Sequence, residues 1–186
     1  VTYEGLIAVF SAADYTASIE KPVVGNAGKI NICVDVLGTE TNYAAIKLEI
    51  ANLIKDYTVA GVVSEGAESS TIVLTNGQSF DFKFHLPDRI ETSLRITTVT
   101  SRNNKFLIDS ADDVKQKLLT NISENYSLGK DFEPEIYFTS SDAPYAGDIL
   151  LEYSIDSGFT WETEIFESDF DELFEFSVDR VTVIQS

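Results

Sequence analysis

Few residues of this chain have side chains that could perform chemistry together. The sequence contains one histidine, His85, one cysteine, Cys33, and 31 Asp and Glu residues. By strand alternation His85 shares a face with Asp81 and Lys83, and no nucleophile motif accompanies it, so we interpret it as a solvated strand residue. One Cys and one His are too few for a zinc site, and no calcium-loop pattern is present. We therefore expect no catalytic residue, no metal site and no cofactor, and we predict that the protein is not an enzyme.

Two weaker chemical interpretations remain among the acidic and glycine-containing segments. Asp169, Asp171 and Glu172 could bind a divalent cation weakly, but a solvated acidic face is the better interpretation. A hydrolase with paired carboxylates would rest only on the abundance of Asp and Glu. Residues 25–29 contain glycines and a lysine, but they lack the spacing of a phosphate-binding loop and precede a strand. We interpret that segment as a loop.

One local motif is specific. Residues 154–161 match S-x-D-x-G-x-T-W, the Asp-box seen in sialidases and other β-proteins. Asp156 can accept hydrogen bonds from backbone amides around a turn, Gly158 can adopt positive φ, and Trp161 can fold back over the hairpin. The motif occurs once here, so it predicts a structural turn formed by Ser154, Asp156, Gly158, Thr160 and Trp161.

An acidic and aromatic segment follows this turn. Its phenylalanines lie at helical spacing from Phe166 to Phe174, or at strand spacing from Phe174 to Phe176. They are core residues by default, or a partner-facing patch otherwise, and acidic residues around aromatic rings suit a subunit contact. The candidate subunit interface is therefore Phe166, Phe170, Phe174 and Phe176.

Two segments have the apolar period of amphipathic helices. We predict a helix over 42–56 and another over 111–126. The second begins with a capping box formed by Ser110 and Asp113, and Gly129 stands where a C-terminal cap is expected.

Most other segments have strand character. Residues 71–75 and 78–86 flank Asn76-Gly77, the pattern of a two-residue hairpin loop. A short helix is expected to open at Ser11. Further strands are predicted at 3–10, 30–37, 90–100, 148–155, 159–165 and 175–184. This order indicates an α+β fold, with two main amphipathic helices packed on antiparallel sheets and β-hairpins at the C-terminus.

The charge distribution suggests how the chain is organised. The 186 residues carry a net charge of −18, which disfavours nucleic acid and anionic membranes as partners. Residues 131–186 hold 15 acidic side chains and one basic side chain. We therefore predict an α+β domain over 1–130 and an acidic β-hairpin region over 131–186, which could be continuous with the first. The longest apolar runs are too short to cross a bilayer, and the single Cys33 favours folding in a reducing, intracellular compartment.

The order of these pieces resembles the C-terminal part of the baseplate J-like proteins, the wedge subunits of contractile-tail phage baseplates and related injection machines. In that family a helix ending in a Y-x-x-A-G-V turn leads to strands and then to a second helix. The residues that carry the resemblance are Ser11 to Tyr15, Lys29 to Leu37, Leu53 to Val62, Thr75 to Phe82, Leu94 to Val99 and Ser110 to Lys115.

The resemblance implies a structural protein of the virion, made in the host cytoplasm and assembled into the tail baseplate. Its expected partners are other baseplate proteins and further copies of itself, in a homo-oligomer. The acidic segment from 148 to 186 departs from the family pattern. The alternative from another class is a carbohydrate-binding β-module, suggested by the Asp-box hairpin, Trp161, Tyr145 and Tyr153.

Overall fold

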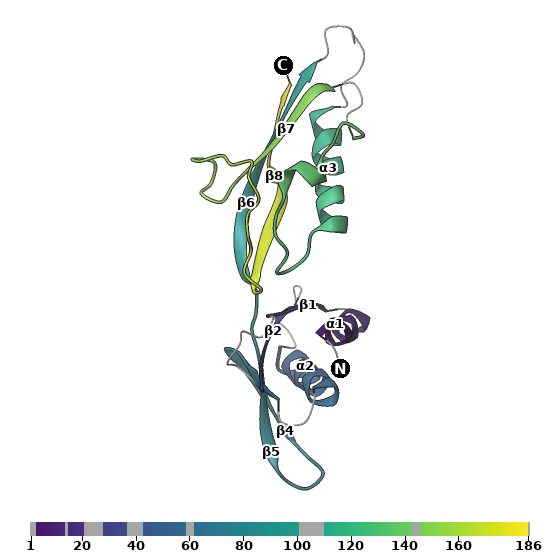
Figure 1. Cartoon of the computed structure of the whole chain (residues 1–186), viewed down its shortest axis with the longest axis vertical. Coiled ribbons are helices and arrows are strands. Elements are labelled where there is room, and N and C mark those ends of the chain that lie inside the picture. Colours follow the sequence, from purple (N-terminus) through teal and green to yellow (C-terminus); the bar gives the residue numbers. More distant parts are fainter. Residues whose placement is uncertain are drawn as a thin grey trace. The chain divides into compact units, whose positions relative to one another are not determined.

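The chain forms two compact units (Figure 1). The computed structural model describes residues 3–13, 15–20, 28–36, 43–58, 62–100, 110–142 and 146–185. Unit 1 comprises Val1–Asp88 and Asp169–Glu172, and unit 2 comprises Arg89–Ser168 and Leu173–Ser186. The structure thus divides the chain at residue 88, whereas the charge distribution had suggested a boundary near residue 130. The two boundaries differ because charged side chains lie on the surface, whereas a structural unit is defined by the residues that pack in its core.

Unit 1 begins with a helix where a strand was expected. Helix α1 spans Tyr3–Ala12, so the prediction of a strand at 3–10 and of a helix opening at Ser11 is wrong. Leu6 and Phe10, four residues apart, are buried on one face. The run from residue 5 to residue 10 is apolar throughout, and such a run gives no period that separates a strand from a buried helix.

Helix α2 (Tyr43–Tyr57) confirms the first predicted amphipathic helix. Its buried face consists of Ile50, Ala51 and Ile54. This face contributes to a hydrophobic core that also contains Leu6, Phe10, Ile30, Ile32, Val34 and Phe84.

A small mixed sheet accompanies these helices. The strands are β1 (Thr16–Ile19), β2 (Lys29–Asp35) and β3 (Val63–Glu65), in the order β1-β2-β3. Strand β1 is antiparallel to β2, and β3 is parallel to it. The sequence predicted β2 alone, because β1 and β3 are too short to establish an alternating pattern.

The predicted hairpin is present as β4 (Glu68–Val73) and β5 (Ser79–Phe84), paired antiparallel. Its loop is longer than the expected two residues. Leu74 N donates to Gln78 O at 2.8 Å, and Gly77 N donates to Leu74 O at 2.9 Å. Thr75, Asn76 and Gly77 therefore form a three-residue loop, with Gly77 at φ 82°.

Unit 2 contains a three-stranded sheet in the order β7-β6-β8. The long central strand β6 spans Asp88–Thr100, β7 spans Ala146–Ser154 and β8 spans Glu172–Gln185. Strand β7 is antiparallel to β6, with Leu94 opposite Tyr153 and Ile96 opposite Leu151. Because β6 separates β7 from β8, these two C-terminal strands do not form a hairpin with each other. Residues 159–165 form only an isolated bridge, Tyr153 with Glu162, so the strand predicted there is wrong.

Helix α3 (Ala111–Asn125) confirms the second predicted helix and its capping box. It ends at Tyr126 in an extended conformation, whereas Gly129 lies in the following turn with φ 68° and is not the cap. A short helix, α4 (Pro134–Tyr137), was not predicted. The core of unit 2 joins the buried face of α3 (Val114, Leu118, Ile122) to one face of the sheet. The architecture is α+β, as expected. Of the described helices, none combines the length and apolar character needed to cross a bilayer.

Candidate functional site

The phenylalanines proposed as a subunit interface lie mostly in the core of unit 2. Phe174 is only 3% exposed, and Phe166 and Phe176 are half-buried against the same core. Phe166 and Phe174 have ring centroids 4.8 Å apart, and Phe132 lies 5.3 Å from Phe174. Aromatic pairs at these separations stabilise a core. Phe174 is therefore a core residue and not part of an interface. Phe166 and Phe176 expose little surface to a partner.

Phe170 belongs to unit 1 and has a different environment. Its ring meets the edge of His85 at 5.5 Å between centroids, and its carbonyl accepts a hydrogen bond from Ser18 Oγ. His85 in turn is bound through its backbone to β2, with Val34 N donating to His85 O at 3.0 Å. Phe170 and His85 are both half-buried. His85 is therefore less solvated than the sequence suggested, and Phe170 packs within its own unit.

The Asp-box turn adopts the predicted geometry around Asp156. Ser154 Oγ donates to Asp156 Oδ1 at 2.6 Å. The backbone amides of Phe159 and Thr160 donate to the same oxygen at 3.0 and 2.9 Å, and the Thr160 hydroxyl donates to Asp156 Oδ2. One carboxylate thus organises the whole turn.

These donors also perturb the acidity of the carboxyl group. Hydrogen bonds from Ser154, then from Thr160 and the backbone, lower the pKa of Asp156 to about 2. Donors that favour the charged form have this effect. The side chain is therefore ionised, and its hydrogen bonds intact, throughout the neutral and mildly acidic range.

A cation–π contact holds Trp161, the last residue of the motif, in place. The Arg95 guanidinium lies 4.3 Å from the centre of the Trp161 ring, and it binds Glu152 through two hydrogen bonds of 2.6 and 2.7 Å. The bond to Glu152 raises the pKa of Arg95. Gly158, at φ 89°, also lies under the indole: a Cβ at this position would sit 3.3 Å from Trp161. Trp161 thus folds back over the hairpin, as predicted.

This arrangement leaves few aromatic faces for a carbohydrate ligand. One face of Trp161 is occupied by Arg95, and Tyr153 is 2% exposed with its hydroxyl donating to Glu162 Oε2 at 3.2 Å. Tyr145, the other aromatic residue considered for a carbohydrate site, lies outside the described residues.

The sequence analysis missed the most exposed aromatic residue of the turn. Phe159 is 88% exposed, and Ile155, in the same loop, is 47% exposed. Figure 1 shows this loop leaving the sheet of unit 2 on the side away from α3. Both residues occupy variable positions of S-x-D-x-G-x-T-W, where the side chain takes no part in the turn. Apolar residues at these positions of a polar turn are the signal that could have identified them.

Reactive groups are not gathered in the described parts of the chain. No group of three or more His, Cys, Asp or Glu residues there could hold a metal ion. Cys33 is fully buried in β2, and burial raises the pKa of its thiol to about 12. This thiol is therefore an inert core residue.

Comparisons with known proteins do not assign this chain to a family. No family model matches the sequence, and a search of curated proteins gives no match.

Proposed function

We propose that this chain is a structural subunit of a contractile-tail baseplate, from the C-terminal part of a wedge protein, and that it works by protein–protein assembly in the virion. Its partners would be other baseplate proteins and copies of itself. The order of α2, the following strands and α3 supports this proposal, since the resemblance to the baseplate J-like proteins rests on that order. Residues 59–61 of the turn after Tyr57, which carry part of the resemblance, lie outside the described residues.

The observation that carries the proposal is the rigid display of Phe159. The residue is 88% exposed, while its backbone amide donates a hydrogen bond to Asp156 Oδ1 at 3.0 Å. Burying a phenylalanine contributes about 2 to 3 kcal/mol to association. Because the loop is already ordered, little conformational entropy is lost when it docks. An exposed aromatic residue on a fixed loop has the properties of a contact hot spot.

The charge of the chain sets the conditions under which copies associate. At a net charge of −18, copies repel one another at low ionic strength. Salt screens this repulsion. Association through Phe159 should therefore tighten as salt is added.

Light scattering of the chain at low and high salt tests the proposal. We expect a defined oligomer at high salt that dissociates in the variant Phe159→Ser. Asp156→Ala, which loosens the loop and keeps the ring, should weaken association less. Val73→Ser is the control, because Val73 is another solvent-facing apolar residue, 67% exposed, in unit 1. A chain that is monomeric at every salt concentration would contradict the proposal.

A further inference from the structure

One edge of the unit 2 sheet has backbone groups that no described residue pairs with. In the order β7-β6-β8, strand β7 pairs with β6 on one side only. On the other side Tyr153 exchanges two backbone hydrogen bonds with Glu162, each of 2.9 Å. This bridge covers the end of the edge and shows which residues of β7 face outward.

The outward-facing residues follow from strand geometry. In an antiparallel pair, the N–H and C=O groups of alternate residues point to opposite sides of the strand. Since the backbone of Tyr153 points away from β6, the backbones of Leu151 and Ile149 do so as well. The register between β6 and β7 is regular from Ser93 to Val99, so this alternation is unbroken. Among the described residues, none forms a hydrogen bond with the outer backbone groups of Ile149 and Leu151.

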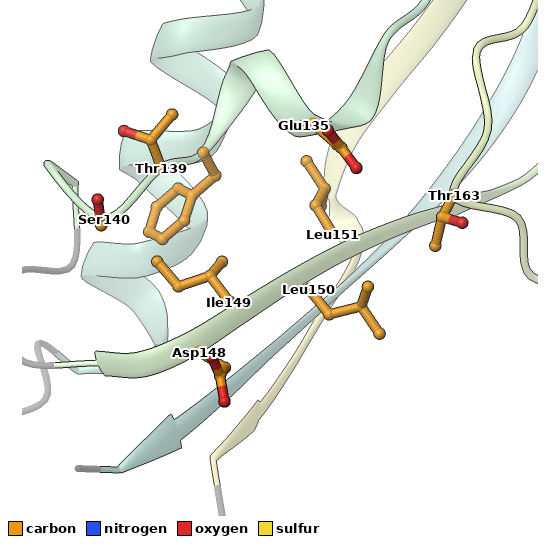
Figure 2. Close-up of a pocket in the computed structure, with 9 residues that line it drawn as sticks. Glu135, Thr139, Ser140, Asp148, Ile149, Leu150, Leu151 and Thr163 are labelled. Carbon is orange, nitrogen blue, oxygen red and sulfur yellow. The ribbon is translucent and has the colours of Figure 1, made fainter.

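A pocket of about 330 Å³ lies along this edge (Figure 2). Figure 2 shows Ile149 and Leu151 on one side of β7 and Leu150 on the other, with Thr139 and Ser140 across the opening and Thr163 at one end. Phe138, which is buried, contributes an apolar wall. The edge is thus open to a ligand and has room beside it.

The rim of the pocket carries negative charge. Glu135 and Asp148 line the pocket, and none of the described residues that line it is basic. Glu162 and Glu164 flank Thr163, and both are exposed. An extended segment with basic side chains would meet complementary charge here.

We propose that the outer edge of β7 binds an extended, basic segment of a partner protein, which adds to the sheet as a fourth strand. The backbone of that segment would pair with Ile149 and Leu151. Its basic side chains, on one face, would reach Asp148, and the side chains on its other face would lie toward Glu135. Strand addition is a common mode of peptide recognition, in which backbone bonds give affinity and side-chain pockets give specificity. The inference goes beyond the proposed function, because it does not depend on Phe159.

A second copy of this chain fits the edge poorly. Pairing two β7 edges would bring Asp148 and Glu135 of one copy close to the acidic residues of the other. Like charges at such short separations oppose pairing. Charged residues on an edge are also a known protection against edge-to-edge aggregation. The charges therefore favour a partner of opposite sign.

Binding of synthetic peptides to the intact chain tests the proposal. The probe is a fluorescent peptide of alternating lysine and valine, measured by anisotropy at low salt. Controls are an alternating glutamate and valine peptide, and a lysine and valine peptide with N-methyl groups on every amide, which cannot donate to the ladder from either edge. We expect binding of the first peptide alone. Equal binding of the N-methylated peptide would mean attraction by charge only, and would overturn the proposal.

Two variants locate the site. Asp148→Lys should weaken binding about fivefold, the upper range for an exposed ion pair. Asp179→Lys is its matched control, an exposed acidic residue of β8, and should change binding much less. Ile149→Pro removes an outward N–H and leaves the β6 ladder intact, so it should abolish binding in a chain whose folding is verified by circular dichroism. Unchanged binding by Asp148→Lys and Ile149→Pro would refute the site.

The variant Phe159→Ser separates this proposal from the assembly role of the Asp-box loop. It should bind the lysine and valine peptide as the wild type does, whether or not it still forms oligomers. Loss of peptide binding in this variant would move the peptide site to the loop and contradict the edge assignment.

Discussion

At the scale of single residues, Asp156 links the acidity of one carboxyl group to the stability of the turn. Its pKa in the folded chain is about 2, below the ordinary value of 3.8. A carboxyl group whose pKa is lowered by folding contributes stability above its unfolded pKa, and loses that contribution as the pH falls through its folded pKa. The contribution of Asp156 is therefore complete above about pH 4 and disappears toward pH 2.

The variant Asp156→Asn tests this linkage. We expect it to be less stable than the wild type at pH 6, and the difference should shrink steadily between pH 4 and pH 2. Thr160→Val, which removes one donor to the same carboxylate, should give a smaller difference of the same sign. Unfolding followed by the fluorescence of Trp161, which packs on this turn, is the measurement. A difference that is constant with pH would show that the carboxylate charge is unimportant.

Two phenylalanines of the acidic C-terminal segments show that composition alone does not distinguish a buried from an exposed side chain. Phe174 is 3% exposed and Phe159 is 88% exposed, although both have acidic neighbours in the sequence. We expect Phe174→Ala to lower the free energy of unfolding by about 3 to 5 kcal/mol, because it opens a cavity in the core. Phe159→Ala should change it by less than about 0.5 kcal/mol. Urea unfolding of both variants measures the contrast, and equal losses would contradict the assigned burial.

Residue chemistry explains why the Asp-box was predictable and the interface was not. Each position that the motif specifies acts within its eight residues: the carboxylate of Asp156 accepts the hydrogen bonds of the turn, and Gly158 adopts positive φ. The burial of Phe174 depends on Phe132 and Tyr126, which lie more than 40 residues away in the sequence. Contacts of this range leave no spacing pattern in the sequence.

At the scale of elements, the confirmed predictions are those in which an apolar pattern extends over several turns or residues and a cap or turn signal marks its end. Helices α2 and α3 each show several turns of apolar spacing, and α3 has a capping box at Ser110. The hairpin β4–β5 has an alternating strand beside a turn signal. Helix α1 differs from the strand predicted at 3–10, because residues 5–10 are all apolar and show no helical period. Strands β1 and β3 were not predicted because their sequences are too short to show an alternating pattern. They are strands because they pair with β2.

The junction between β3 and β4 depends on close contact of two backbones. A Cβ atom at Gly66 would lie 2.1 Å from the carbonyl oxygen of Phe84. A backbone neighbour cannot move aside as a flexible side chain can. We expect Gly66→Ala to cost about 3 kcal/mol, the upper range for overpacking, in the stability of unit 1.

Gly77→Ala is the matched comparison for Gly66→Ala. Nothing lies within 4 Å of a Cβ at Gly77, but its φ is 82°. This variant should therefore cost only the backbone strain, about 1 kcal/mol. Hydrogen exchange of amides in β2 and β5 measures both variants. A smaller loss for Gly66→Ala than for Gly77→Ala would mean that the two backbones do not meet.

At the scale of the whole molecule, the charge gradient along the sequence is not a gradient between the units. Residues 131–186 have a net charge of −14 and residues 1–130 a net charge of −4. Counted by unit, however, unit 1 has 14 acidic and 5 basic residues, and unit 2 has 17 acidic and 8 basic residues. Each unit therefore has a net charge of −9. The basic residues between 89 and 130 fold with the acidic C-terminal segment, so the gradient marked no structural boundary.

This equal division predicts how salt affects folding. The range of electrostatic repulsion falls from about 30 Å at 0.01 M to about 8 Å at 0.15 M salt. Repulsion within a unit of charge −9 opposes its compact state, so screening should stabilise both units by similar amounts. Hydrogen exchange in sodium chloride measures the two units in one sample, from the amides of α2 and of α3. Sodium chloride is preferable to sulfate, which strengthens apolar burial by itself. Stabilisation restricted to α3 would contradict this prediction. It would mean that the repulsion comes from the acidic segment 131–186 and that the basic residues between 89 and 130 do not offset it.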